Sequence, residues 1–189
     1  MLRFIRPVAT VGLVAVLCVA CGAPAATPTP AVAPPPTSAP SPAANAAPVD
    51  ASRADLLNAA NAAYRSANLS AAIELYQRVV NTPSTGEPAA ASAAIDGLAR
   101  FRAMLALLQA GREDDARAEL SALQTADANA PMARLATQLW DQYGMVGDVR
   151  GACAQLQPQI ATQAGPALST LQGLGVGVDA QSLCSLPGG

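Results

Sequence analysis

The sequence predicts an all-α protein, and three observations favour this class. Alanine is the most abundant residue, and aromatic residues make up only 3% of the chain. β-branched residues are sparse beyond the N-terminal apolar stretch, whereas alanine is the strongest helix former and allows helices to pack closely. Apolar residues also recur at helical spacing, and no segment shows the sustained alternation that indicates a strand.

The N-terminal residues have the features of an export signal. Arg3 and Arg6 precede an apolar run over residues 8–20, which ends at Ala20-Cys21. The run is about 13 residues long, whereas a membrane-spanning helix needs about 20. Small residues and prolines follow the cysteine.

This segment resembles a bacterial lipoprotein signal, although Cys18 stands where such signals usually carry leucine. The resemblance implies a signal peptide over residues 1–20 and lipid attachment at Cys21. It also implies an extracytoplasmic protein, with a bacterial membrane as its first partner. An ordinary secretory signal, which would leave Cys21 as a free thiol, is the alternative.

Residues 21–49 are predicted to form a disordered linker. The segment from Gly22 to Val49 contains no charged residue and is rich in proline separated by alanine, serine and threonine. Such a composition cannot form a packed core and is typical of a partly extended tether. We expect a plain spacer rather than a proline-rich docking motif.

The folded domain is predicted over residues 50–189, beginning with a helix that Ser52 caps. Turn residues and prolines divide the rest into further helices. The expected helices cover residues 52–64, 70–80, 88–110, 113–125 and 131–143, and another begins at residue 149. Ser70 is the expected cap of the second helix. Pro158 and Pro166 are expected to cut the C-terminal part into shorter helical pieces.

Three of the predicted turns share a spacing. Each has a small residue at the turn, alanine five residues later and a large apolar residue four further on, which places the last two on one helix face. The three sets are Ala67, Ala72 and Tyr76; Gly111, Ala116 and Leu120; and Gly147, Ala152 and Leu156. The pattern resembles the tetratricopeptide repeat, a helix-turn-helix unit of 34 residues.

The resemblance implies antiparallel helical hairpins stacked as a short solenoid. It covers roughly residues 53 to 160 and requires an insertion near Pro83–Pro88, because the first two units are further apart than the repeat period. Trp140 departs from the pattern, since the family prefers a small residue there. A generic α-helical bundle is the alternative.

In tetratricopeptide proteins the first helix of each pair builds a protein-binding groove. Carried onto this chain, the resemblance implies Leu57, Asn61, Tyr64 and Arg65 in the first unit, Phe101, Leu105, Leu108 and Gln109 in the second, and Arg134, Thr137, Asp141 and Met145 in the third. Such a mixture of charged, amide and apolar groups suits a peptide. The alternative is that Leu57, Phe101, Leu105 and Leu108 belong to the core.

Two cysteines remain in the folded domain once Cys18 leaves with the signal and Cys21 takes the lipid. In an oxidising compartment, Cys153 and Cys184 are expected to form a disulfide bond. The bond would tie the glycine-rich C-terminal tail, which is expected to be separate from the helical core, to the third helical unit.

Composition excludes several functions. All basic residues are arginine, and acidic residues outnumber them 13 to 11, which disfavours nucleic acid. The chain has no histidine and hence lacks the commonest general base and metal ligand. Glu113, Asp114 and Asp115 are interpreted as a solvated helix start rather than a metal site. We expect no enzyme, metal or cofactor, and a mechanism that uses carboxylates alone is the remaining enzymatic alternative.

The sequence thus predicts a lipid-anchored scaffold that binds a protein or peptide of the cell envelope. A helical carrier of a small apolar ligand is the second hypothesis, and a purely structural spacer is the third. The first requires an open, mixed polar and apolar face, and the second requires a greasy pocket.

Overall fold

The structure is a computed structural model that describes residues 51–187. The expected signal peptide, the lipid-bearing Cys21 and the expected linker lie outside the described residues. Within 51–187 the fold is all-helical and contains no strand, as the composition predicts. Its elements are α1 (Arg53–Arg65), α2 (Leu69–Asn81), α3 (Ala89–Gln109), α4 (Glu113–Asp127), α5 (Pro131–Val146), α6 (Val149–Gly173) and the short 3-10 helix η1 (Ser182–Cys184).

Side-chain caps explain where the first two helices begin. The Ser52 hydroxyl accepts a hydrogen bond from the Asp55 amide, and the Asp55 carboxylate accepts one from the Ser52 amide, which completes a capping box. In α2 the prediction was wrong by two residues. Asn68 is the cap, because its Oδ1 accepts from the Ala71 amide, and the helix therefore includes Ser70.

The three small turn residues of the repeated pattern have the same backbone conformation. Ala67, Gly111 and Gly147 have φ values of 61°, 72° and 79°. This left-handed conformation reverses the chain within a short turn, and it is costly for any residue but glycine. Ala67 is therefore a strained position, and Gly111 and Gly147 are not.

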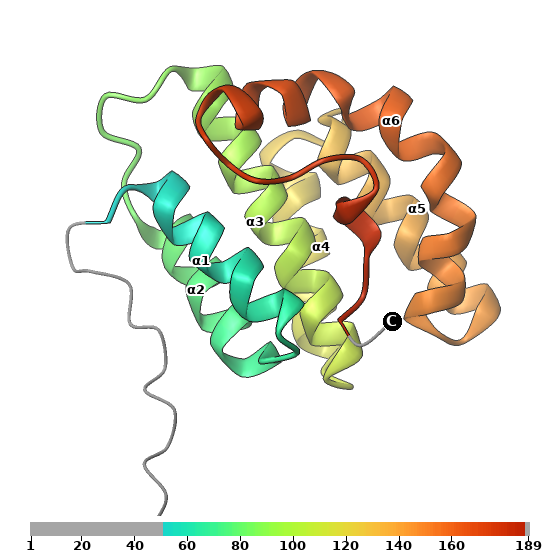
Figure 1. Cartoon of the computed structure of the whole chain (residues 1–189). Helices are drawn as coiled ribbons and strands as arrows, with labels where there is room; N and C mark the ends of the chain where they lie inside the picture. The colour runs from blue at the N-terminus through green and yellow to red at the C-terminus, as the bar shows by residue number, and fades with distance from the viewer. Residues whose placement is uncertain (1–50, 188–189) are drawn as a thin grey trace, which may run out of the picture. The chain divides into compact units, whose positions relative to one another are not determined.

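The long helix α3 lies at the centre of the domain (Figure 1). It contacts α2 and α4, its neighbours in sequence, and also α1, α5 and α6. The helix is consequently buried on almost every side, and even Arg102 is only 4% exposed. Its sequence suits this position, because it consists mainly of alanine and leucine and carries few charges.

Helix α6 contradicts the expectation that prolines divide the C-terminal region. It runs unbroken through Pro158 and Pro166 and changes direction along its length (Figure 1). A proline removes one helical hydrogen bond and bends the helix. Both prolines are exposed, whereas one continuous face is buried, formed by Ala152, Leu156, Ile160, Ala164, Leu168 and Leu171. Packing of this face against α5 and α3 keeps the helix intact.

The C-terminal tail, residues 174–187, crosses the domain in front of α3 and is part of its core (Figure 1). Val176, Val178 and Leu183 are at most 4% exposed and belong to the same apolar cluster as α1 and α3. A disulfide bond joins Cys153 of α6 to Cys184 of η1, the pairing that the sequence predicts. The expectation that the tail stands apart from the helical core was wrong.

Candidate functional site

The residues of the predicted groove do not form one open face. Leu57, Asn61, Tyr64, Phe101 and Leu105 are at most 3% exposed and lie in the core; Leu108 is buried as well. The burial of the apolar members supports the alternative that they belong to the core. The remaining residues are at least partly accessible: Gln109 and Thr137 are half-buried, and Arg65, Arg134, Asp141 and Met145 are exposed.

Two buried tyrosines, Tyr64 of α1 and Tyr76 of α2, have polar partners inside the domain. The Tyr76 hydroxyl donates to Asn61 Oδ1 at 2.8 Å, and the Gln109 amide donates to the Tyr64 hydroxyl. The Arg102 guanidinium lies 5.1 Å from the centre of the Tyr64 ring, a cation–π distance. Burial raises the pKa of both phenols above the ordinary value, so both stay neutral donors and acceptors.

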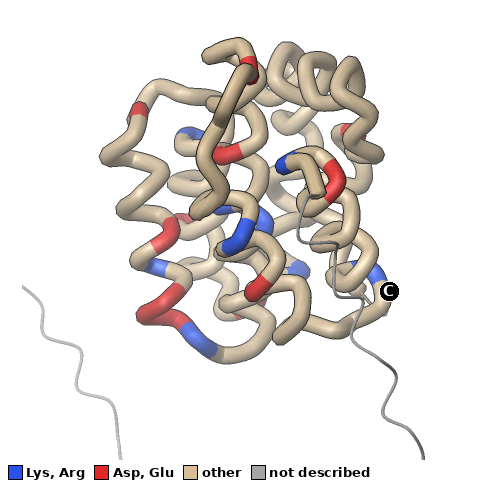
Figure 2. Tube along the Cα trace, turned by 90° about the vertical axis from the view of Figure 1, so that its left-hand side faces the viewer, with Lys and Arg blue, Asp and Glu red and all other residues tan. Residues whose placement is uncertain are grey.

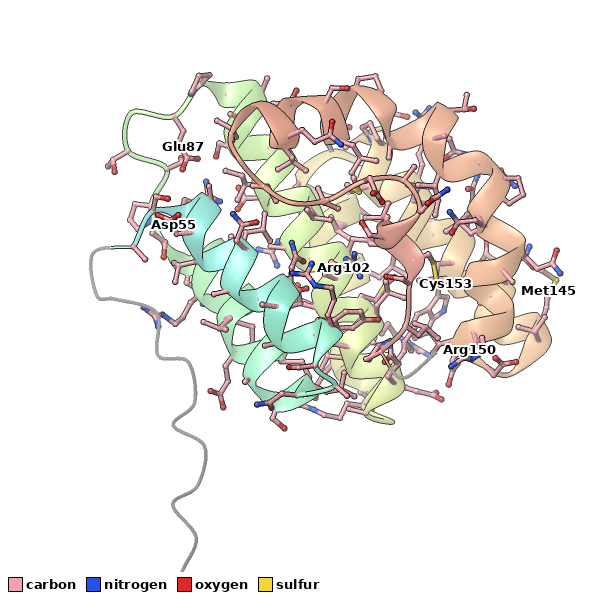
Figure 3. All side chains as sticks on the ribbon, viewed as in Figure 1. Asp55, Glu87, Arg102, Met145, Arg150 and Cys153 are labelled. Atoms are coloured by element: carbon pink, nitrogen blue, oxygen red, sulfur yellow. A yellow bond between two sulfur atoms is a disulfide. The ribbon has the colours of Figure 1, made fainter. Side chains whose placement is uncertain are left out.

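The C-terminal tail is held on α1 and α3 by hydrogen bonds to its main chain. Asn58 of α1 donates to the Gly175 carbonyl and accepts from the Gly177 amide, both at 3.0 Å. Arg102 donates to the Ser182 carbonyl. In Figure 3 Arg102 lies between α1 and the tail, and Cys153 lies where the tail meets α6. The tail of this chain therefore covers α1 and α3 at Asn58 and Arg102.

A cavity of about 740 Å³ lies elsewhere, between α3, α4, α5 and α6. Its walls are mainly small or apolar, and they come from the N-terminal half of α3, the α4–α5 turn and the C-terminal half of α6. The apolar lining residues include Ala89, Ala90, Ala93, Ala94, Leu123, Ala126, Met132, Pro166 and Ala167. The cavity is half-open to solvent, and Ala90 and Ala93 are exposed. Its volume falls within the range of small-molecule sites, about 300–1,000 Å³.

Charged groups stand at the margin of this cavity. The lining includes Glu87, Asp96, Arg100 and Asp127. Figure 3 shows Glu87 on the loop before α3, close to the start of α1. Burial raises the pKa of the Asp96 carboxyl above its ordinary value, against the opposing effects of Arg53 and Arg100.

Arg53 organises one side of the margin. Its side chain is 3% exposed and reaches from α1 to Glu87 at 2.8 Å, to Ser92 at 3.0 Å and to the Val79 carbonyl at 3.2 Å. It also pairs with Asp96. Arg100 also forms a salt bridge, with Glu119 at 3.0 Å.

The sequence pattern of α3 could have pointed to this site. Residues 89–94 are almost all alanine, and the next charged residue is Asp96. By itself the stretch predicts only a helix start. Ala89, Ala90, Ala93 and Ala94 share one face of the helix and leave space beside it, but only the packing of α6 shows that this space becomes a cavity.

Other kinds of site are not found in residues 51–187. This range holds no group of histidine, cysteine, aspartate or glutamate suited to a metal ion. Nor does any helix in it have the length and hydropathy to cross a membrane. Charges are scattered along a mostly uncharged trace (Figure 2), and the acidic start of α4, residues 113–115, adjoins Arg112.

Comparisons with known proteins found no relationship. No protein-family model matches the chain. No curated protein and no solved structure matches it either.

Proposed function

We propose that this protein is a lipid-anchored, extracytoplasmic binding module that holds a small, mainly apolar ligand in the α3–α6 cavity. The observation that supports this function is the cavity itself, about 740 Å³ in volume, walled by alanine and edged by a few charged groups. Such an apolar lining with a small number of polar groups is typical of ligand sites. In this proposal the ligand is bound and not converted.

The anchor in this proposal is the lipid on Cys21. Residues 21–49 act as a tether, and the folded domain stands away from the membrane. The sequence features that support it are the short apolar run, the Ala20-Cys21 junction and the uncharged, proline-rich stretch that follows. A ligand-binding domain held in this way would deliver its ligand to, or retain it near, the envelope surface.

The helical domain is a tetratricopeptide-like array in this proposal, with pairs α1–α2, α3–α4 and α5–α6. The shared conformation of the turns at Ala67, Gly111 and Gly147 supports it, as do the contacts of each helix with the next within these pairs. One departure shapes the site. Helix α6 also packs on α3, and this closure of the third pair onto the second forms the cavity wall.

A second candidate function is the scaffold for a protein or peptide. The observation in its favour is that the tail is held as a peptide would be, through the main chain of Gly175 and Gly177. Arg65, Arg134 and Asp141 remain exposed for a partner. If this function is right, replacement of these three by alanine should leave the circular-dichroism spectrum unchanged and abolish capture of the envelope partner.

The test of the cavity uses a compact neutral probe, adamantanemethanol, with the mature chain, residues 21–189, carrying Cys21→Ser. Titration followed by amide chemical shifts should move signals of α3, α5 and α6. Ala93→Phe should fill the cavity from its exposed wall and weaken binding by at least about tenfold. Ala118→Phe is the matched control, because Ala118 is exposed on α4 and does not line the cavity. Equal binding by both variants would refute the site.

A further inference from the structure

The charge on the cavity margin is unbalanced. Three carboxylates line the cavity, those of Glu87, Asp96 and Asp127, and the one lining cation is Arg100. Arg100 is paired with Glu119, a residue outside the lining. The helix ends do not restore the balance. Helices α3 and α5 begin and α4 ends at the cavity, so their partial charges sum to about half a positive charge, which is less than one carboxylate carries.

Glu87 and Asp96 form their salt bridges with one buried cation, Arg53. Arg53 donates to both carboxylates and also to Ser92 and the Val79 carbonyl, so most of its five donors are used. Its own charge balances one carboxylate, and the second remains uncompensated. The Asp96 side chain is still 39% exposed and lines the cavity, where a ligand can reach it.

We propose that the cavity ligand is an apolar cation, with a compact hydrocarbon body against the alanine walls and an ammonium or guanidinium group against Asp96 and Glu87. This ligand class rests on the proposed function and specifies it. A charge-assisted hydrogen bond to a partly buried carboxylate is stronger than a neutral one. A hydrated metal ion fits less well, because the alanine walls offer it no oxygen ligands.

The test compares three probes that share one hydrocarbon cage and differ in charge: adamantanemethylamine, adamantanemethanol and adamantanecarboxylate. With the mature Cys21→Ser chain near neutral pH, the amine should bind roughly five- to tenfold more tightly than the alcohol, and the carboxylate should bind most weakly. Equal affinity for the three probes would overturn the proposed ligand class and leave the apolar cavity supported. No binding of any probe would overturn both proposals.

Substitutions locate the cationic group. Asp96→Asn should remove most of the preference for the amine over the alcohol and leave the alcohol affinity within about twofold. Asp114→Asn is the matched control, an exposed carboxylate at the start of α4 that does not line the cavity. Both carboxylates pair with Arg53, so Glu87→Gln serves as a second variant that removes the other charge, and melting curves verify the folding of both variants. A preference for the amine that survives in both folded variants would refute this placement.

Discussion

The disulfide bond between Cys153 and Cys184 should supply a large share of the stability of the folded domain. The two residues are 31 positions apart, and in the chain-entropy model a closed loop of this length stabilises the folded state by about 3–4 kcal/mol. For a domain of this size, that loss corresponds to a fall in melting temperature of about 10–15 °C. The double variant Cys153→Ala/Cys184→Ala should show this fall in thermal melts followed by far-ultraviolet circular dichroism.

The helical spectrum at room temperature should remain close to that of the wild type, because Val176, Val178 and Leu183 still bury their side chains without the bond. Limited proteolysis should then cut the tail more often, since its opening no longer has to break a covalent link. The reduced wild-type protein is the matched control and should melt with the double variant. A fall of less than about 3 °C would refute the loop-entropy argument, and loss of helicity at room temperature would show that the tail does not dock without the bond.

Three further predictions test the anchor, a turn and the tail. Cys21→Ser should abolish incorporation of a labelled fatty acid, because the thiol is the proposed attachment atom, and equal labelling would refute the anchor. Ala67→Gly should raise the free energy of unfolding by about 0.5–1 kcal/mol in denaturant titrations, because φ is 61° at this position; destabilisation would contradict the strain. Hydrogen bonds from Ser182 lower the pKa of Asp179 below 3.8. The Asp179 carboxylate therefore stabilises the folded state fully above pH 3.8, and this stabilisation is lost as the pH falls through the folded-state pKa. The melting temperature of Asp179→Asn should therefore fall less steeply below about pH 4 than that of the wild type, and parallel curves would exclude this role.

The sequence predicts those parts of the fold that local chemistry controls. The Ser52 cap, the loop at residues 83–88 and the break at Gly147 depend on a few neighbouring residues, and each lies where the sequence places it. The prediction of Ser70 as the cap of α2 was wrong because Asn68 and Ser70 are both good cap residues. Only the geometry shows that Asn68 Oδ1 reaches the Ala71 amide.

Long-range packing explains the larger errors. The prolines of α6 are local helix breakers, yet its buried face keeps the helix continuous against α3 and α5. The cavity has the same origin, because its walls come from four successive helices, α3 to α6, whose packing brings residues 84 to 170 together. The candidate site was therefore beyond reach of motif analysis, although the alanine run at 89–94 and the acidic residues beside it were visible in the sequence.

The C-terminal tail covers the part of α1 and α3 where the sequence predicts a binding groove. A segment with several glycines has few side chains to fix its position, so Asn58 and Arg102 bind its main chain instead. Arg102 has no carboxylate partner within residues 51–187, and its Nε and one terminal nitrogen lack hydrogen-bond acceptors. Burying such a cation is costly, and its contacts with the Tyr64 ring and the Ser182 carbonyl offset only part of the cost. The position of the tail thus depends on specific polar contacts and a covalent bond together, and the cavity beside α3 is the site that we propose for a ligand.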